Sequence, residues 1–427
     1  MLDLTKLAKQ MQGLSQHLAS ESAASRQRLD VAQKLLEKAH ARQAELQEIQ
    51  EKWRDRLIFS PPVPIEPLDT FFDIPVPPKI HTVFATDGSQ IAPSHHEIAY
   101  CYLINVGRVM LHYGQGKQPL LDSIPEVFYE PEDLYVSRQW GIRTEEWMGY
   151  RRTVSEAVAL AELGVDWVTS QKTLYPIFAK EDNKKINSVS EIGEIEEKPE
   201  MNDCKIPTLA MVDGSLLLWF LEQLPQDACD LIIPPILDAW EQLRLAGIPL
   251  VGYLSASRSS ESLSFLRLQA CTYSTPNCNV QCNDLPDKAP CQVFDPLRDI
   301  VFWSSRLQPG QRSPLWRSTN KIVDQYSDAH KIYFCYVHVG TEVARVEFPA
   351  WVAENSQLLD LSLGLVLAQI QKGYGYPVVL AEAHNQAVVR GGDRATFFAL
   401  LEQQMIKVGL RNVGTSYKET RKRGSIA

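Results

Sequence analysis

The tripeptide Asp-Gly-Ser occurs twice in the 427-residue chain, each time directly after an apolar run. The first copy lies in A-T-D-G-S-Q (85–90) and the second in M-V-D-G-S-L (211–216), so the two aspartates are Asp87 and Asp213. An aspartate at the end of a buried strand stands where the sheet meets solvent, and the glycine permits a tight turn. Two such carboxylates side by side repel each other unless a hard divalent cation lies between them. Asp-Gly is also a common turn dipeptide, so it is the repetition that indicates a metal site.

The order of elements around the two aspartates predicts an α/β fold. We expect a strand into Asp87, strands at 97–106 and 108–113 joined as a hairpin at Gly107, a helix over 144–163, and a strand into Asp213. We expect residues 115–140 to be irregular and Gly164 to end the helix. This order resembles the ribonuclease H-like fold, a mixed sheet flanked by helices. There, carboxylates from adjacent strands and a nearby helix hold two metal ions that activate water for phosphodiester cleavage.

The helix over 144–163 should supply a third carboxylate. Glu156 shares a helix face with two leucines that follow it one and two turns later, so we expect it to point toward the sheet. A surface ion pair with Arg152, four residues earlier, would explain the same residue equally well. Glu162 is the second candidate for the third carboxylate.

The C-terminal segment Y-G-Y-P-V-V-L-A-E-A-H contains Tyr376 and His384. We expect a short strand at 374–380 and a largely helical segment over 382–407. A histidine near that sheet edge could ligate metal or pass a proton to the leaving oxygen. A hydrogen-bonded structural histidine and a packing tyrosine are the alternative interpretations.

Several of these segments together resemble the NurA family. They are the two Asp-Gly-Ser copies, the helix with R-R-T-V-S-E, the segment Y-L-S-A-S-R, and Y-P-V-V-L-A-E-A-H, and the resemblance covers about residues 80–400. It implies a prokaryotic nuclease that acts in the resection of DNA double-strand break ends. It also implies a ribonuclease H-like core, manganese-dependent cleavage of DNA by 5′-to-3′ exonuclease or endonuclease action, a homodimer, and a hexameric HerA-type ATPase as partner.

The resemblance also assigns roles to single residues. The family's metal ligands fall on Asp87, Glu156 and Asp213, and its tyrosine and histidine fall on Tyr376 and His384. With two Mn²⁺ ions these residues would form the catalytic site, and His384 would be an auxiliary ligand or proton donor. A non-catalytic scaffold with the same fold, which binds DNA ends or the ATPase, is the alternative.

Regions outside the core lengthen the chain. Residues 1–58 are expected to be helical, and they carry a heptad seam at Leu4, Leu7, Met11, Leu14 and Leu18. This seam predicts either a coiled-coil arm that packs on a partner or an amphipathic helix on its own domain. We expect a proline-rich linker at 59–79, a nuclease domain at 80–410 with a charged surface insertion at 178–205, and a basic tail at 411–427.

Four cysteines lie in the loop 271–291, namely Cys271, Cys278, Cys282 and Cys291. Four thiols in such a loop could hold a structural zinc ion or an iron–sulfur cluster. Reduced thiols without a ligand are the alternative, because the spacing lacks a C-x-x-C pair.

The net charge of −9 argues against a generally basic surface but leaves room for a local basic groove. The segment 306–321 contains four cations and a tryptophan without an acid, a composition that suits a phosphate backbone and a stacked base. Arg258 stands where the family has a lysine. The predicted DNA contacts are therefore Arg258, Arg306, Arg312, Trp316, Arg317 and Lys321, with an ordinary solvated loop as the alternative for 306–321.

The apolar runs are shorter than the roughly 20 residues that a membrane span needs. The N-terminal segment alternates charged residues with leucine and does not resemble a signal peptide. We therefore expect a cytoplasmic protein without a membrane partner.

Overall fold

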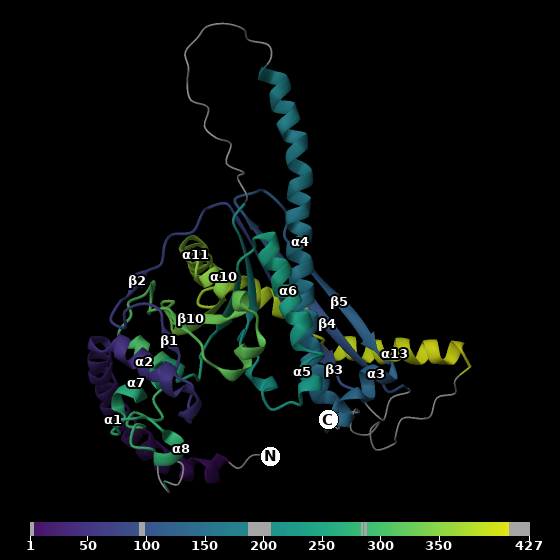
Figure 1. Ribbon diagram of the computed structural model, residues 1–427. Coiled ribbons are helices and arrows are strands. Elements are labelled where there is room, and N and C mark those ends of the chain that lie inside the picture. The colour runs from purple at the N-terminus through teal and green to yellow at the C-terminus, as the bar shows by residue number, and fades with distance from the viewer. Residues whose placement is uncertain (1–3, 94–98, 187–205, 283–284, 286–287, 410–427) are drawn as a thin grey trace, which may run out of the picture. The chain divides into compact units, whose positions relative to one another are not determined.

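The computed structural model describes residues 4–93, 99–186, 206–282, 285 and 288–409. The chain divides into two compact units, each of which contains strands and helices (Figure 1), and this confirms the predicted α/β class. The first unit comprises Met1–Pro75, Gly214–Trp219 and Gly252–Ala353, and the second comprises Val76–Asp213, Phe220–Val251 and Glu354–Ala427.

The second unit contains a mixed sheet with strand order β5-β4-β3-β6. Strands β3 (His81–Ile91), β4 (Tyr102–Tyr113) and β5 (Leu120–Phe128) are antiparallel neighbours, and β6 (Thr208–Asp213) runs parallel to β3. This is the order and direction expected of a ribonuclease H-like sheet, so the predicted fold class is confirmed.

Helices cover both faces of this sheet. The hydroxyl of Thr86 on β3 donates a hydrogen bond to the main-chain carbonyl of Glu156 in α4 at 2.9 Å, whereas Ser89 donates to the carbonyl of Ala387 in α12. Residues an odd number of positions apart in a strand point to opposite faces, so α4 and α12 pack on opposite sides of β3. The helices of the second unit are α3 (Pro131–Tyr135), α4 (Thr144–Ile186), α5 (Gln226–Cys229), α6 (Ile233–Ala246), α11 (Ser356–Lys372), α12 (Val378–Ala387) and α13 (Gly391–Lys407).

The core of the second unit follows the two-residue alternation of β4. Its members come from β4, β5, α3 and α4, and all are at most 6% exposed. They are Tyr102, Ile104, Val106, Phe128, Leu134, Met148 and Ala159. The odd-numbered residues of β4 face α12 instead, as Asn105 shows by donating to the carbonyl of Ala387 at 2.8 Å.

Two glycines do not end elements as predicted. Gly107 lies inside the continuous strand β4, where a Cβ would come within 2.6 Å of the Ala383 carbonyl in α12. Gly164 lies inside α4, where a Cβ would come within 2.9 Å of the side chains of Leu243 and Ile248. Both glycines permit the close approach of another element, so the hairpin at Gly107 and the helix end at Gly164 were wrong.

Two further expectations for the second unit were also wrong. Residues 115–140 are not irregular throughout, because they form β5, α3 and a 3₁₀-helix at Val136–Trp140. The predicted strand at 374–380 is a turn followed by the start of α12, since Pro377 occupies the N-cap position and fixes the first turn. The predicted surface insertion lies partly in α4 and partly, at 187–205, outside the described residues, as does the tail from 410 onward.

The first unit is built on an antiparallel hairpin of β10 (Ile332–His338) and β11 (Val343–Pro349). Residues Gly252 to Leu254 of β7 (Leu250–Leu254) pair with β11. The short strands β8 (Gln311–Arg312) and β9 (Trp316–Arg317) pair with β10. The helices of this unit are α1 (Leu4–Ala41), α2 (Gln43–Trp53), α7 (Glu261–Ala270), α8 (Cys278–Gln281), α9 (Asp299–Ser304) and α10 (Ala350–Ala353).

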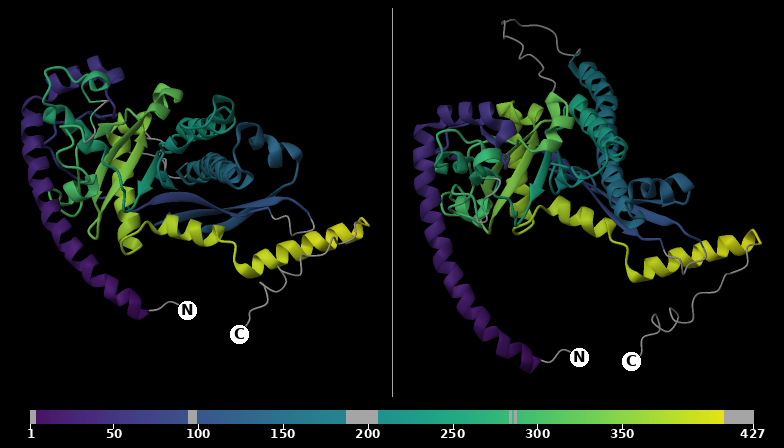
Figure 2. Two further views of the ribbon diagram at one scale, coloured as in Figure 1. Left: turned by 90° about the horizontal axis from the view of Figure 1, so that it is seen from below. Right: turned by 60° about the horizontal axis from the view of Figure 1, so that its bottom comes forward.

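Helix α1 has two parts with different surroundings. In its C-terminal part Ala32, Leu36 and Ala39 are at most 2% exposed and join a core that includes α7 and α9. In its N-terminal part Leu4 and Leu18 are 68% and 58% exposed. Figure 2 shows this part continuing beyond the helices that cover the rest of α1. The alternative of an amphipathic helix on its own domain therefore holds for the C-terminal part.

The segment at 59–79 is not a free linker. Strand β1 (Val63–Pro64) pairs with β9, and β2 (Phe72–Asp73) pairs with β8. Between these strands Leu68 is fully buried in the core of the first unit. The prolines keep this segment extended, as the composition predicted. The composition did not reveal that β8 and β9 pair with it. Across the described part of the chain, no helix is both long and apolar enough to cross a membrane.

Candidate active site

The register of β3 and β6 brings Asp87 and Asp213 to equivalent positions. Ala85 of β3 pairs with Met211 of β6 in a parallel ladder, and each aspartate follows two residues later in its own strand. Residues two apart point to the same face, so both carboxylates lie on the α12 side at the same end of neighbouring strands. The two Asp-Gly-Ser copies differ otherwise: Gly214 turns the chain with φ +133°, whereas β3 continues through Gly88 to Ile91.

His384 reaches Asp87 from α12. Its Nδ1 lies 2.8 Å from Oδ2 of Asp87, and the side chains are 65% and 24% exposed, respectively. The hydrogen bonds of Asn105 and Ser89 to the Ala387 carbonyl hold the end of α12 against β3 and β4. His384 is the seventh residue of α12, which begins at Val378, four residues before the predicted helix start at 382.

Tyr376 reaches Asp213 from the turn before α12. Neighbouring atoms remove part of the hydration of the Asp213 carboxylate, and this raises its pKa above the usual value. The hydrogen bond from the Tyr376 hydroxyl acts in the opposite direction, while the charge of Asp87 raises the pKa further and His384 lowers it. All four predicted residues from β3, β6 and the C-terminal segment thus influence one another.

Glu156 joins this group from the other face of the sheet. The absence of a side chain at Gly88 leaves the space that Glu156 and Arg152 fill, because a Cβ there would collide with Oε1 of Glu156 and lie 2.6 Å from Cγ of Arg152. The Glu156 side chain is 23% exposed, and its Oε1 lies 3.1 Å from Nε of Arg152. The predicted face and the predicted ion pair with Arg152 therefore both occur.

The pKa of Glu156 is raised to about 7. Desolvation by burial is the main cause, and the negative charges of Asp87 and Asp213 add to it. Arg152 and the Gly88 amide act against this rise. A carboxyl with this pKa is only partly ionised at neutral pH, so the site holds more potential negative charge than its own cations neutralise.

Glu162 lies outside this group. It is exposed on α4, and its charge acts on Arg108, which forms a two-pronged ion pair with Asp122 at 2.7 and 2.9 Å. Of the two candidates on α4, only Glu156 is affected by both aspartates. The helix periodicity that favoured Glu156 was therefore an informative signal.

The donor set suits a hard divalent cation such as Mn²⁺ or Mg²⁺, since it consists of carboxylate oxygens with one imidazole. Among the described residues, however, no group of three or more His, Cys, Asp or Glu side chains is already arranged to hold a metal ion. Glu156 is instead turned to Arg152. Metal ligation by Glu156 would require its carboxylate to exchange the guanidinium for the metal.

A sequence model of the NurA domain matches residues 81–389, which is more than half of the chain. The chain belongs to the NurA family. The NurA nuclease from Sulfolobus solfataricus shares 13% sequence identity with it over 88% of this chain and 97% of that chain, with a TM-score of 0.37. A comparison with curated proteins gave no match. The matched region contains every residue of the site described above.

Two of the DNA contacts predicted for this NurA-family chain are corrected. Trp316 is fully buried and packs edge to face against Phe265 in the core of the first unit. Arg312 is 5% exposed and holds Glu66 through two contacts of 2.6 and 2.8 Å. The segment lacked acids of its own, but Glu66 reaches it from a part of the chain about 246 positions away.

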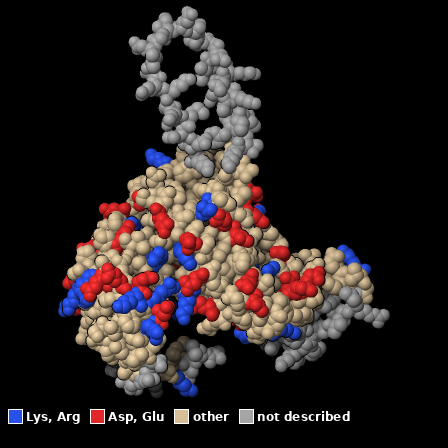
Figure 3. Space-filling model, viewed as in Figure 1, with Lys and Arg blue, Asp and Glu red and all other residues tan. Residues whose placement is uncertain are grey.

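The other predicted DNA contacts in the first unit differ in accessibility. Arg306 is half-buried beside the Phe71 ring, and burial lowers its pKa. Arg258, Arg317 and Lys321 are exposed. Basic and acidic side chains are intermixed over the face of the NurA-family chain in Figure 3, so binding of a phosphate backbone would depend on local groups of cations.

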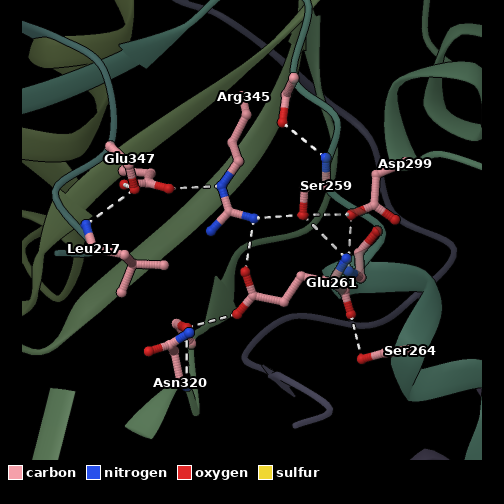
Figure 4. A network of polar contacts seen from close by, with 12 residues as sticks. Leu217, Ser259, Glu261, Ser264, Asp299, Asn320, Arg345 and Glu347 are labelled. Carbon is pink, nitrogen blue, oxygen red and sulfur yellow. Dashed lines mark hydrogen bonds and ion pairs between the residues drawn. The ribbon is translucent and has the colours of Figure 1, made fainter. Parts of the chain in front are cut away.

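A buried ionic network fixes the loop that carries Arg258. Arg345 on β11 is 2% exposed and contacts Glu347 and Glu261 at 2.7 Å and Ser259 at 3.1 Å (Figure 4). Ser259, the neighbour of Arg258, is thus tied to β11 through Arg345. Nothing in the sequence indicated this network, because its members are distant along the chain.

Sequence reasoning also missed two residues of the site itself. Arg152 was considered only as a surface partner, and Gly88 only as a turn residue. No local signal identified the role of Gly88, because the polar run D-G-S-Q shows no alternation of apolar and polar residues, although the strand continues through it to Ile91. The four cysteines of the loop 271–291 lie together in the first unit around one small cavity.

Proposed function

We propose that this chain is a manganese-dependent DNA nuclease whose site consists of Asp87, Glu156, Asp213, Tyr376 and His384. The observation that supports this most strongly is the placement of both aspartates at equivalent ends of parallel strands, with Glu156 brought beside them at Gly88. Membership of the NurA family supplies the reaction class.

The charge of the site supports a cation as cofactor. Asp87, Asp213 and Glu156 would be the oxygen ligands of one or two Mn²⁺ ions, with His384 as an auxiliary ligand. Bound Mn²⁺ would lower the pKa of a water molecule and neutralise the charge that develops on the phosphate. The pKa values of Glu156 and Asp213 are raised chiefly by burial and then by repulsion between the carboxylates, and such a cation would relieve the repulsion.

His384 and Tyr376 have distinct roles in the proposal. Asp87 engages Nδ1 of His384, so Nε2 is the nitrogen that can carry a proton to the leaving oxygen of the DNA strand. The high exposure of His384 leaves it accessible to substrate. Tyr376 orients the Asp213 carboxylate by hydrogen bonding and would position the phosphate beside it.

The finer features of the proposal rest on the family resemblance. We propose 5′-to-3′ exonuclease action, with endonuclease action on the same strands, in the resection of double-strand break ends. The active form would be a homodimer, and a hexameric HerA-type ATPase would feed the DNA to it. The exposed Arg258, Arg317 and Lys321 would contact the phosphate backbone.

The decisive test is degradation of linear DNA labelled at either the 5′ or the 3′ end, in Mn²⁺, with and without the ATPase. Wild type should release the 5′ label as short products before the 3′ label. Asp87→Asn and Asp213→Asn should lose at least about a hundredfold of the rate, the size of effect seen when one electrostatic element of an active site is removed.

Glu162→Gln is the matched control, because it removes a carboxylate from the same helix as Glu156 without touching the site. It should retain the wild-type rate. The proposal is wrong if folded wild type fails to degrade single- or double-stranded DNA under all these conditions, or if the aspartate variants retain activity. DNA binding without cleavage would then favour the scaffold.

A further inference from the structure

The proposed nuclease site leaves the four cysteines at 271–291 without a role. Cys271 follows the last residue of α7, and Cys278 begins the short helix α8, which ends immediately before Cys282. Cys291 lies in the turns that lead to α9. All four belong to the first unit, whereas the proposed catalytic residues belong to the second. These thiols are therefore not among the residues of the proposed catalytic site.

The four cysteines line the same small cavity. Its volume is about 10 Å³, and Phe59 and Arg267 also line it. Cys278 and Cys291 are 5% and 6% exposed, and Cys271 and Cys282 are partly exposed. A cavity of this volume has room for about one water-sized sphere, so its contents are limited to a single small ion or water molecule.

Local helix geometry brings two of the thiols onto one face. The amide of Cys282 donates to the carbonyl of Cys278 at 2.9 Å, which closes one helical turn between them. Residues four apart in a helical turn share a face, so both side chains point the same way. Cys271 and Cys291 line the same cavity as this pair, so all four thiols surround one space.

Arg267 on α7 supplies a positive charge at the same cavity. Its Nε and one terminal nitrogen lie 3.4 and 3.5 Å from Sγ of Cys291. The guanidinium stacks on the Phe59 ring, 3.9 Å from the ring centroid. N–H donors that face a sulfur stabilise its thiolate form, and such outer contacts are typical of metal-bound cysteine.

We propose that Cys271, Cys278, Cys282 and Cys291 bind one structural zinc ion. Each thiol would give up its proton on binding, so zinc uptake by the four thiols releases four protons to the solvent. As noted above, the described side chains are not yet arranged around an ion. Binding would therefore involve rotation of the cysteine side chains about χ1. This movement would be short, because all four side chains already line the same cavity.

Two features favour zinc over other occupants. The space suits one ion better than an iron–sulfur cluster, which contains several iron and sulfide atoms. Thiolates prefer Zn²⁺ to Mn²⁺, so the proposed nuclease metal would not compete for this place. The spacing of three residues between Cys278 and Cys282 lies within the range found for pairs of zinc ligands.

The proposed role of the ion is to fix the segment 271–291 onto α7. Within the described residues of this segment the only regular element is the single helical turn of α8. Cys271 and Arg267 attach the cavity to α7, whose Leu263 and Phe265 are at most 1% exposed in the core of the first unit. A four-thiolate site would link this segment to α7 through metal–sulfur bonds.

The test is the metal content and the cobalt spectrum of the full chain purified without chelators. We expect about one zinc per chain by elemental analysis. After removal of zinc, added Co²⁺ should give the intense visible bands and sulfur-to-metal charge-transfer absorption of tetrahedral thiolate ligation. Zinc should raise the Tm of the metal-free chain by about 5 °C or more, because it binds the folded state alone.

Cys278→Ser and Cys291→Ser should each lose most of the zinc and the charge-transfer absorption. Cys335→Ser is the matched control, since Cys335 is a fully buried cysteine on β10 away from the cavity. It should retain one zinc per chain. Far-UV circular dichroism of each variant separates loss of the site from loss of the fold, and Cys291→Ser serves if Cys278→Ser does not fold.

Three results would overturn the proposal. They are a folded wild type that lacks zinc and binds no Co²⁺ through sulfur, a site filled by iron and sulfide, or two disulfides among the four cysteines in freshly purified protein. Asp213→Asn should keep its zinc. This outcome separates the zinc proposal from the proposed nuclease function, because either can fail without the other.

Discussion

Replacement of Glu156 by glutamine should make the metal-free protein more stable at alkaline pH than wild type. The pKa of Glu156 is about 7 in the folded chain, against an ordinary value of 4.5. A group with a raised pKa in the folded state stabilises that state below the unfolded pKa, and this contribution is lost as the pH rises through the folded pKa. The relevant window is therefore pH 4.5 to 7.

The size of the effect follows from the difference between the two pKa values. A difference of about 2.5, at about 1.4 kcal/mol for each pH unit, corresponds to about 3.4 kcal/mol. The pKa of about 7 already includes the opposing effect of Arg152. The Glu156 side chain is 23% exposed, so screening by solvent reduces the expected gain for Glu156→Gln at pH 8 to about 2 to 3 kcal/mol. At pH 5 the two proteins should differ by less than about 1 kcal/mol.

The assay is urea denaturation at half-unit pH intervals from 5 to 8, with a chelator present to remove divalent cations. Manganese should largely cancel this difference at pH 8. At a hundredfold excess over its dissociation constant it should stabilise wild type by about 2.7 kcal/mol and the glutamine variant much less. Glu162→Gln, on the exposed side of the same helix, is the control and should follow the wild-type pH profile.

One result would refute the reasoning directly. If wild type and Glu156→Gln lose stability in parallel between pH 5 and pH 8, the Glu156 carboxyl does not titrate near neutral pH. The excess negative charge that supports a cation at this site would then be absent. If Glu162→Gln gave the larger change, the third carboxylate would have been assigned to the wrong residue.

Three further variants test separate parts of the site and the first unit. Gly88→Ala should weaken manganese binding by about tenfold, measured by calorimetry, because the new methyl group displaces the Glu156 carboxylate. Tyr376→Phe should shift the acidic limb of the rate–pH profile to higher pH, since it removes the hydrogen bond that lowers the pKa of Asp213. Trp316→Ala should cost about 3 to 5 kcal/mol of unfolding free energy without weakening DNA binding by the folded fraction, because Trp316 is a core residue.

The sequence predicted the sheet of the second unit well because its signals are local. Apolar runs and their order identified β3, β6 and α4, and the parallel pairing of β3 with β6 follows from the helix between them. The errors arose at Gly107 and Gly164, where glycine normally marks an end. Each of these glycines instead makes room for a neighbouring part of the fold. Such a neighbour is distant in the sequence, so it cannot be inferred from one sequence alone.

The structure agrees with the predicted placement of the carboxylates better than with the predicted exposure of the DNA contacts, for a related reason. Asp87, Asp213 and Glu156 occupy regular elements whose faces can be deduced from the period of strand and helix. The cations of 306–321 lie outside long elements, so periodicity gave no information on their exposure. Arg312 found its partner in Glu66, which lay in a segment interpreted as a linker. Composition alone cannot reveal such a pair.

The contrast between the two Asp-Gly-Ser copies explains how one short sequence serves two purposes in one site. At the second copy Gly214 adopts φ +133°, so the chain leaves the sheet and Asp213 stands at a strand end. At the first copy the strand continues, and Gly88 instead creates the space through which Glu156 approaches Asp87 from the opposite face. A site built only from strand ends would gather carboxylates on one face. The missing side chain at Gly88 lets α4 contribute as well, so the charges of both aspartates act on the Glu156 carboxyl. A cation bound by all three carboxylates would relieve this repulsion.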